Sequence, residues 1–277
     1  MAHIVIITHT FDDFAGRRYL MGEMAGHWRD AGHRVSVAEG LDNWPDADVA
    51  ILHVDHSLVP DTYMQQARQR YPKLINGNAV DIRKRLVSRH LVTRDDDWSG
   101  PVMIKTDLNR GGAREMRYLH LMHEAKRPAL INSQGMVFSQ EPYPVLASKA
   151  EVNPVMWNTP GVVVEKFLPE RDERGYWLRW WTFLGRKERC IRALGKDPLV
   201  RSGAVTDRTL VEVPQELRAE RERLGFDFGK FDFVIHDGRV VFFDATRSPL
   251  TALHSVYPAV AEQNRLLSHG INDWLDP

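Results

Sequence analysis

The chain has 277 residues, enough for a large buried core and for one to two domains. Its 37 Lys and Arg residues balance 37 Asp and Glu residues, so no net field favours nucleic acid or an anionic membrane as a partner. The single cysteine, Cys190, excludes an internal disulfide and a multi-cysteine metal site. The first residues are typical of an apolar strand rather than a leader peptide, and no apolar run would span a membrane, so we expect a cytoplasmic protein.

The first third of the chain alternates short apolar runs with amphipathic segments, which predicts strands alternating with helices. Strands are expected at 3–9, 34–38, 48–54 and 73–75, and helices at 15–30, 62–70 and 81–92. This order is typical of a small parallel sheet with helices on its faces. Because the polar, acidic stretch 93–100 follows, we place the boundary of an N-terminal α/β domain after residue 92.

After residue 100 the pattern changes to strands and hairpins with fewer helices, which indicates an α+β arrangement. Strands are expected at 101–107, 144–148 and 162–167, hairpins at 177–194 and 231–249, and helices at 113–126, 213–224 and 259–269. The fold class is therefore α/β and α+β, with the small parallel sheet first.

The terminal hairpin FDFVIHDGRVVFFDATRSP carries one acid in each apolar strand, Asp232 and Asp244. An acid in such a strand is costly to bury unless a cation or a donor satisfies it. With the hydroxyl of Thr246 nearby, the acids indicate a divalent-metal site, and two solvated acids are the alternative. A two-residue turn at Asp237 and Gly238 would put the acids on opposite faces. A three-residue loop that also includes residue 236 would put them on one face, and we expect this loop.

Lys105 ends a predicted strand and is followed by two glycines, Gly111 and Gly112. A lysine there can reach a phosphate as a point charge, while glycines let backbone N–H groups approach it closely. The loop matches neither the Walker pattern nor the dinucleotide fingerprint, so a glycine turn beside a solvated lysine is the alternative.

Two further segments suggest binding groups. The run VVVEKFLPE places four residues at a strand end where they could line an adenine pocket: Glu165, Lys166, Phe167 and Leu168. An exposed strand end is the alternative. Arg179 lies in an apolar strand and needs an anionic partner, and Arg192 in the next strand is a second candidate.

Histidines and acids follow two of the predicted strands: His9, Asp12 and Asp13 follow the first, and His53, Asp55 and His56 follow the third. Because ligands bind beyond the carboxyl ends of parallel strands, we expect these loops to meet in a substrate pocket. A metal site, a general base and plain loop caps are the alternatives. Arg201 and Arg247 are further candidates for contact with a substrate.

Taken in order, the lysine strand, the glycine loop, the EKFL segment, the apolar-strand arginine and the paired acids resemble the ATP-grasp superfamily. Its members include glutathione synthetase, D-alanine–D-alanine ligase and the enzymes that add amino acids to protein C-termini. The resemblance covers roughly residues 75–255. It implies a two-lobed grasp fold, with lobes at 93–164 and 165–277, after a domain at 1–92.

The resemblance implies ATP and Mg²⁺ as cofactors. It assigns the ATP phosphates to Lys105, the adenine and ribose to residues 165–168, and Mg²⁺ to Asp232 and Asp244. The second acid in the superfamily is usually glutamate with asparagine two residues later, whereas this chain has Asp244 and Thr246.

The resemblance also implies a reaction. A substrate carboxylate would attack the γ-phosphate of ATP, and an amine would then displace phosphate from the acyl-phosphate, which Arg179 would hold. Lys84 or Arg85 would supply an earlier lysine of the superfamily. The alternatives are a grasp-fold kinase of a hydroxyl and a nucleotide-binding module without turnover. Expected partners are small-molecule or peptide substrates, and the sequence leaves a homodimer open.

Overall fold

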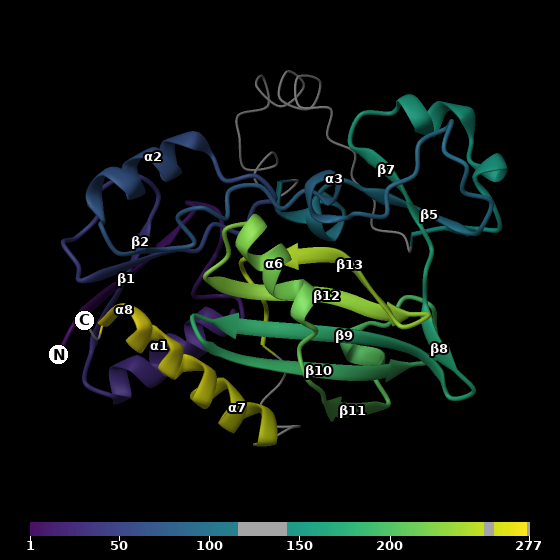
Figure 1. The fold of residues 1–277 in the computed structure, drawn as a ribbon. Coiled ribbons are helices and arrows are strands. Elements are labelled where there is room, and N and C mark those ends of the chain that lie inside the picture. Colours follow the sequence, from purple (N-terminus) through teal and green to yellow (C-terminus); the bar gives the residue numbers. More distant parts are fainter. Residues whose placement is uncertain (116–142, 252–257, 276–277) are drawn as a thin grey trace.

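The computed structural model describes residues 1–115, 143–251 and 258–275 (Figure 1). The strands are β1 (His3–Thr8), β2 (Arg34–Glu39), β3 (Val49–Leu52), β4 (Leu74–Ile75), β5 (Val102–Thr106), β6 (Val145–Leu146), β7 (Val162–Lys166), β8 (Glu170–Asp172), β9 (Gly175–Leu184), β10 (Lys187–Gly195), β11 (Asp207–Leu210), β12 (Phe228–His236) and β13 (Arg239–Thr246). The α-helices are α1 (Leu20–Asp30), α2 (Asp61–Arg70), α3 (Lys84–Val87), α6 (Gln215–Arg223), α7 (Pro258–Ser268) and α8 (Asn272–Leu275).

The first sheet is parallel, in the order β2-β1-β3-β4, as the sequence predicted. Helices cover both faces of this sheet, which explains why the whole apolar run of β1 is buried. Ile4 and Ile6 pack in one core with α1, whereas Val5 and Ile7 pack in another with α2. Because successive side chains of β1 point to opposite faces of the sheet, this strand contributes to the core on each face.

The other two sheets are antiparallel. The order β6-β5-β7 forms a three-stranded sheet, and β11-β10-β9-β12-β13, with β8 paired to β9, forms a six-stranded one. Because β7 runs through Lys166, the expected lobe boundary between residues 164 and 165 cuts this strand. The limits of the domain and the lobes stay a prediction.

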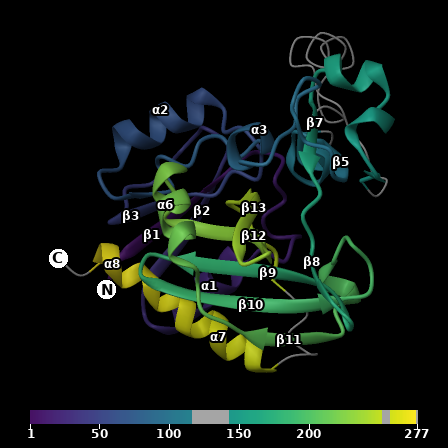
Figure 2. The same cartoon turned by 45° about the vertical axis from the view of Figure 1, so that its right-hand side comes forward.

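The parallel sheet and the six-stranded sheet share one core. Leu184 of β9 and Phe228 of β12 are fully buried in the cluster that contains β1 and α1. Helix α7 contacts α1, β9 and β10, as both cartoon views show (Figures 1 and 2). Trp28 of α1 donates its Nε1–H to the carbonyl of Ser268 at 2.8 Å. The end of the described chain thus packs back on its beginning.

Part of the predicted secondary structure is wrong or untested. Of the basic helix expected at 81–92, only the single turn of α3 is helical. The end of this segment joins β7 instead, where the Val92 N–H donates to the Val164 carbonyl at 2.8 Å. Tertiary pairing therefore outweighs a weak helix propensity. The helix expected at 113–126 lies mostly outside the described residues, and the short strands β8 and β11 were not predicted.

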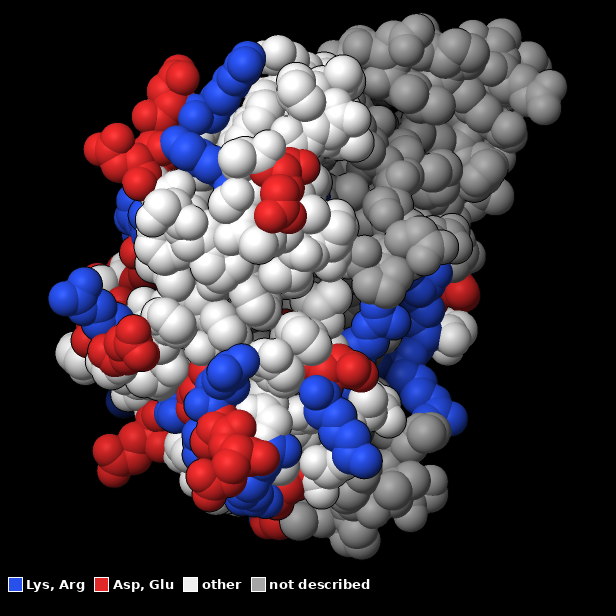
Figure 3. Space-filling model, turned by 90° about the vertical axis from the view of Figure 1, so that its right-hand side faces the viewer, with Lys and Arg blue, Asp and Glu red and all other residues white. Residues whose placement is uncertain are grey.

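The surface on the side of β5, β7 and β8 carries both signs of charge (Figure 3). Acidic and basic side chains lie intermingled around a broad uncharged area, in keeping with the equal numbers of the two kinds in the sequence. Within the described ranges, no helix has the length and apolar character needed to cross a membrane.

Candidate active site

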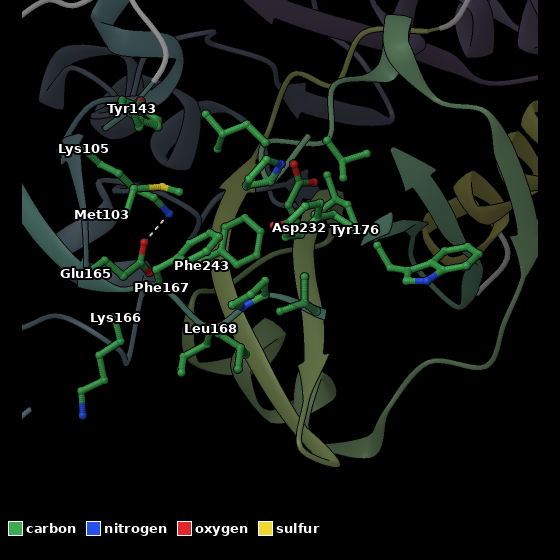
Figure 4. A pocket seen from close by; sticks show the side chains of 18 of the residues that line it. Met103, Lys105, Tyr143, Glu165, Lys166, Phe167, Leu168, Tyr176, Asp232 and Phe243 are labelled. Atoms are coloured by element: carbon green, nitrogen blue, oxygen red, sulfur yellow. Dashed lines mark ion pairs between the residues drawn. The ribbon is translucent and has the colours of Figure 1, made fainter. Parts of the chain in front are cut away.

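A cavity of about 500 Å³ lies between β5 and β7 on one side and β9, β12 and β13 on the other (Figure 4). Most of its walls are apolar, with Phe167, Leu168 and Phe243 among them. Lys105 and Asp232 also line it, from different sheets. A cleft with mostly apolar walls and a few polar groups is typical of a small-molecule site.

Lys105 is held by a buried carboxylate. It forms an ion pair with Glu165, and the Ser88 hydroxyl donates a hydrogen bond to the same carboxylate (Figure 4). The Lys105 Nζ also lies 4.7 Å from the centroid of the Phe243 ring. The Glu165 carboxylate therefore positions the lysine inside the protein, and its expected contact with the ribose or adenine stays a prediction.

The segment 165–168 forms one wall of the cavity. Lys166, Phe167 and Leu168 all line it, and the Nζ of Lys166 lies 5.0 Å from the centroid of the Trp98 ring (Figure 4). The Phe167 N–H donates to the Pro101 carbonyl at 2.9 Å. The segment therefore offers apolar contacts on the cavity side, and its backbone is tied to the start of β5.

The two glycines lie in a single 3-10 turn, Asn109–Gly112. Gly111 and Gly112 have φ values of 64° and 76°, in the left-handed region that favours glycine. Gly111 lines the cavity, and Asn109 donates its Nδ2–H to the Ala245 carbonyl of β13 at 2.7 Å. The turn therefore lies beside the strand that carries Asp244.

The hairpin of β12 and β13 turns at two residues, so the expected three-residue loop is wrong. His236 pairs directly with Arg239 across the turn. Asp237 and Gly238 both have positive φ, 48° and 76°, which is the conformation that a two-residue hairpin turn requires.

A β-bulge, which was not predicted, brings the two acids together. Phe233 pairs with Phe242, but the next pair is Asp232 with Asp244, so Phe243 is an extra residue on β13. Without this shift, the two-residue turn would have put the acids on opposite faces. They lie opposite each other on one face because of the bulge.

Lys84 lies beside the second acid. Its Nζ is 3.6 Å from Asp244 Oδ1, and the side chain is buried. Burial lowers the pKa of Lys84, but the surrounding acidic groups, Asp244 first, outweigh this and raise the pKa above its ordinary value. Arg85 instead pairs with Asp107 at 2.5 Å. Of the two residues that the sequence could not separate, the structure brings Lys84 to the acids.

The first acid also has a lysine neighbour. Asp232 Oδ1 lies 2.8 Å from the Nζ of Lys230, two residues earlier on the same face of β12. Thr246 pairs with Lys230 across the strands, so its side chain shares the face of the two acids. Its hydroxyl accepts a hydrogen bond from the Ser248 N–H at 3.3 Å.

The two arginines do not join this site. Arg179 pairs across the sheet with Phe233, the neighbour of Asp232, so the arginine and the acid point to opposite faces. Arg179 donates two hydrogen bonds to Glu170, at 2.8 and 2.9 Å, and Arg192 donates a third at 2.8 Å. An internal carboxylate therefore satisfies both arginines in this structure, and the substrate or acyl-phosphate role expected of them stays a prediction.

The loops after β1 and β3 meet at the carboxyl end of the parallel sheet. The rings of His9 and His56 lie 4.4 Å apart, centroid to centroid. The Asp12 carboxylate accepts hydrogen bonds from the backbone N–H groups of His9 at 2.9 Å and Asp55 at 3.1 Å. Burial lowers the pKa of each histidine to about 4 and raises that of Asp12 to about 6. Both imidazoles are therefore neutral at pH 7, and Asp12 titrates near neutrality.

The other acids of these loops have different surroundings. Asp55 accepts a hydrogen bond from the Tyr19 hydroxyl at 2.7 Å and forms an ion pair with Arg114 at 2.5 Å. Asp13 is exposed, with a φ of 53°. Neither Asp13 nor Asp55 lines the main cavity. Arg201, which was also expected to contact a substrate, does line it.

Two residues that were expected to contact a substrate are buried in the protein. His53 has no exposed surface, and its ring packs edge-on against Phe14 and Tyr19. Arg247 is 1% exposed and donates hydrogen bonds to the carbonyls of Ala79, Val80 and His56. Both positions therefore suit structural roles better than contact with a substrate.

Among the residues around the cavity and the acids that the sequence reasoning missed are Ser88, Tyr143, Lys230 and Phe243. The spacing of Lys230 and Asp232 on one strand could have indicated their pairing, because residues two apart share a face. Ser88 and Tyr143 reach the site through tertiary contacts, and no local pattern marks them.

No family model matches the chain, and no curated protein matches it. Among solved structures it is similar to the D-alanine–D-alanine ligase of Bacillus anthracis complexed with ATP, at 13% identity and a TM-score of 0.54. The match covers 99% of this chain and 98% of that one. It is also similar to the macrocyclase MdnC of Microcystis aeruginosa MRC, bound with the precursor peptide MdnA. Here the identity is 8%, the TM-score 0.57, and the coverage 98% and 99%.

A third similar structure is the ATP-grasp ligase PsnB, complexed with a phosphomimetic variant of its minimal precursor, Mg and ADP. The identity is 11%, the TM-score 0.54, and the coverage 98% of each chain. The protein therefore has the fold of ATP-grasp ligases, as the sequence resemblance implied. The likeness extends over nearly the whole chain, beyond the roughly 75–255 on which the resemblance rested.

Proposed function

We propose that the protein is an ATP- and Mg²⁺-dependent ligase that joins a carboxylate to an amine through an acyl-phosphate. The observation that carries the proposal is the placement of Lys105 and Asp232 on the walls of one largely apolar cavity. Such a cavity suits a nucleotide, whose base would pack on the apolar walls while its phosphates lie beside the charged groups. The ligase fold of the chain supports this class of reaction by analogy.

The acids fit Mg²⁺ by their chemistry. Asp244 Oδ1 is buried, has the Lys84 ammonium at 3.6 Å, just beyond hydrogen-bond distance, and belongs to the residue that faces Asp232. Mg²⁺ prefers oxygen ligands and is often held by one or two carboxylates together with substrate phosphates. Asp232 and Asp244 would hold the ion, with Thr246 as a further oxygen on the same face. Bound there, Mg²⁺ would neutralise charge on the phosphates during phosphoryl transfer.

The residues around the acids have distinct proposed roles. Lys105, oriented by Glu165, would bind a phosphate oxygen as a point charge. The buried Lys84 would add a second positive charge beside Asp244. Phe167 would pack on the base and exclude water, which strengthens the electrostatic contacts at the phosphates.

The proposed substrates are a small acid or a peptide carboxylate, together with an amine. The similar structures include a macrocyclase bound with a precursor peptide, which supports a peptide as one class of substrate. Arg201, on the lining of the cavity, would attract a carboxylate.

The test is to measure ADP and phosphate release with ATP, Mg²⁺ and panels of acids and amines, added singly and in pairs. A ligase releases free phosphate only when an acid and an amine are present together. Turnover with a hydroxyl acceptor alone, giving a phosphorylated product, would replace the ligase with a kinase. Nucleotide binding without turnover under any combination would favour a regulatory module.

Substitutions test the metal site within the same assay. Asp232→Asn and Asp244→Asn should each lower the rate by about 100-fold or more, since a metal supplies several kcal/mol of charge stabilisation. Asp237→Asn is the matched control, because this turn aspartate is 92% exposed and asparagine tolerates its positive φ. Full activity of both acid variants would remove the proposed metal role.

A further inference from the structure

A second group of metal-ligand side chains lies at the carboxyl end of the parallel sheet, outside the main cavity. It consists of His9, Asp12 and His56, all of them buried, with exposed fractions of 7%, 3% and 9%. One candidate ligand atom from each lies within 4.8 Å of the other two. The three residues come from two loops that are more than 40 residues apart in sequence, and the parallel order of β1 and β3 brings them together.

The spacing of this group is close to that of a bound transition-metal ion. Zn²⁺ binds imidazole nitrogen at about 2.0–2.1 Å and carboxylate oxygen at about 2.0–2.2 Å, so two such ligand atoms of one ion lie at most about 4.3 Å apart. The candidate ligand atoms of the three residues lie up to 4.8 Å apart, and small rotations of the side chains would bring them within this distance. The 4.4 Å separation of the two imidazole rings already places them side by side.

Neighbouring groups hold the three side chains in place. The Asp12 carboxylate oxygen Oδ2 accepts two backbone hydrogen bonds, from His9 and Asp55, which fixes its direction and leaves Oδ1 as the candidate ligand. The Phe11 N–H donates a hydrogen bond to Nδ1 of His9 at 3.3 Å, so this nitrogen carries the lone pair of the neutral ring, the pair that a metal ion would take instead. Arg247 donates a hydrogen bond to the His56 carbonyl and so anchors that loop. Such outer contacts orient the ligands of known metal sites.

We propose that His9, Asp12 and His56 form a site for a divalent transition-metal ion of the Zn²⁺ type. Two imidazoles and one carboxylate suit zinc and its neighbours in the first transition row, whereas Mg²⁺ prefers a set of oxygens only. Three protein ligands leave a fourth position for water or a substrate group, as in catalytic zinc sites. The proposal does not depend on the ligase activity, and the site is distinct from the acids of the hairpin.

The experiment measures Zn²⁺ binding to the full chain after treatment with a chelator, by equilibrium dialysis in the presence of excess Mg²⁺. The Mg²⁺ occupies oxygen-only sites such as the paired acids and leaves an imidazole site open. Wild type should retain one equivalent of Zn²⁺. His56→Gln and Asp12→Asn should each weaken binding by about tenfold or more, the loss that even outer contacts of metal sites produce.

Two controls keep the result decisive. His33→Gln removes a histidine outside the group and should bind Zn²⁺ like wild type. Cobalt-substituted wild type should show two hyperfine-shifted imidazole N–H proton signals, a readout that remains valid if a variant fails to fold. Absence of stoichiometric Zn²⁺ binding in wild type, or undiminished binding by a folded His56→Gln variant, would overturn the proposal.

Discussion

Replacing His53 with phenylalanine should make the protein less sensitive to acid. The His53 ring is fully buried, lies 5.3 and 4.8 Å from the rings of Phe14 and Tyr19, and has no hydrogen-bond partner for either nitrogen within the described ranges. Burial therefore lowers its pKa from 6.5 to about 3. The folded protein keeps the ring neutral at pH values where the unfolded chain binds a proton.

The sign and size of the effect follow from this difference in pKa. The stability that His53 contributes is fully present above pH 6.5 and is lost as the pH falls from 6.5 towards 3. Each pH unit in this window lowers the free energy of unfolding by about 1.4 kcal/mol, which gives about 2 kcal/mol at pH 5. His9 and His56 act in the same direction, but they are present in both proteins and cancel in the comparison.

Urea unfolding at about pH 7.5 and about pH 5 measures the effect. The free energy of unfolding of wild type should fall by about 2 kcal/mol more than that of His53→Phe. His33→Gln, measured in parallel, controls for the loss of a histidine outside the core. Phenylalanine preserves the aromatic packing, and any constant change in stability cancels between the two pH values. An equal fall in wild type and His53→Phe would refute the reasoning.

Three further predictions concern the site and the core. Lys105→Met should weaken ATP binding by about tenfold or more in a calorimetric titration, because a charge-assisted contact with a phosphate is lost. Lys187→Met is the control, because Lys187 is exposed, and this variant should bind ATP like wild type. Equal affinities of the two variants would count against the phosphate role of Lys105. Arg179→Met should lower the free energy of unfolding by about 1–3 kcal/mol, since Glu170 loses two charge-assisted hydrogen bonds but keeps Arg192 as a partner, and an unchanged free energy of unfolding would contradict this. Phe231→Ala should lower it by about 3–5 kcal/mol, because this fully buried ring packs among four aromatic neighbours, and an unchanged urea midpoint would disprove the packing argument.

The sequence alone determined the parallel sheet and the order along the chain of the segments that form the candidate site. Apolar runs alternating with amphipathic segments predicted the parallel sheet, and the histidines and acids after two of its strands were expected to meet there. The lysine strand, the EKFL segment and the acids in apolar strands also suggested the grasp fold. These features are local, because they depend on periodicity and on the cost of placing a charge among apolar neighbours.

Only the tertiary structure decided which side chains share a face and which partners they have. The acids Asp232 and Asp244 lie together because one extra residue in β13 shifts the register, and no local pattern marks that bulge. Glu165 turns to Lys105, and Arg179 turns to Glu170 on the opposite face of the sheet from the acids. A charged residue in a strand reveals that it needs a partner, but the partner is chosen by segments that are distant in the chain and close only after folding.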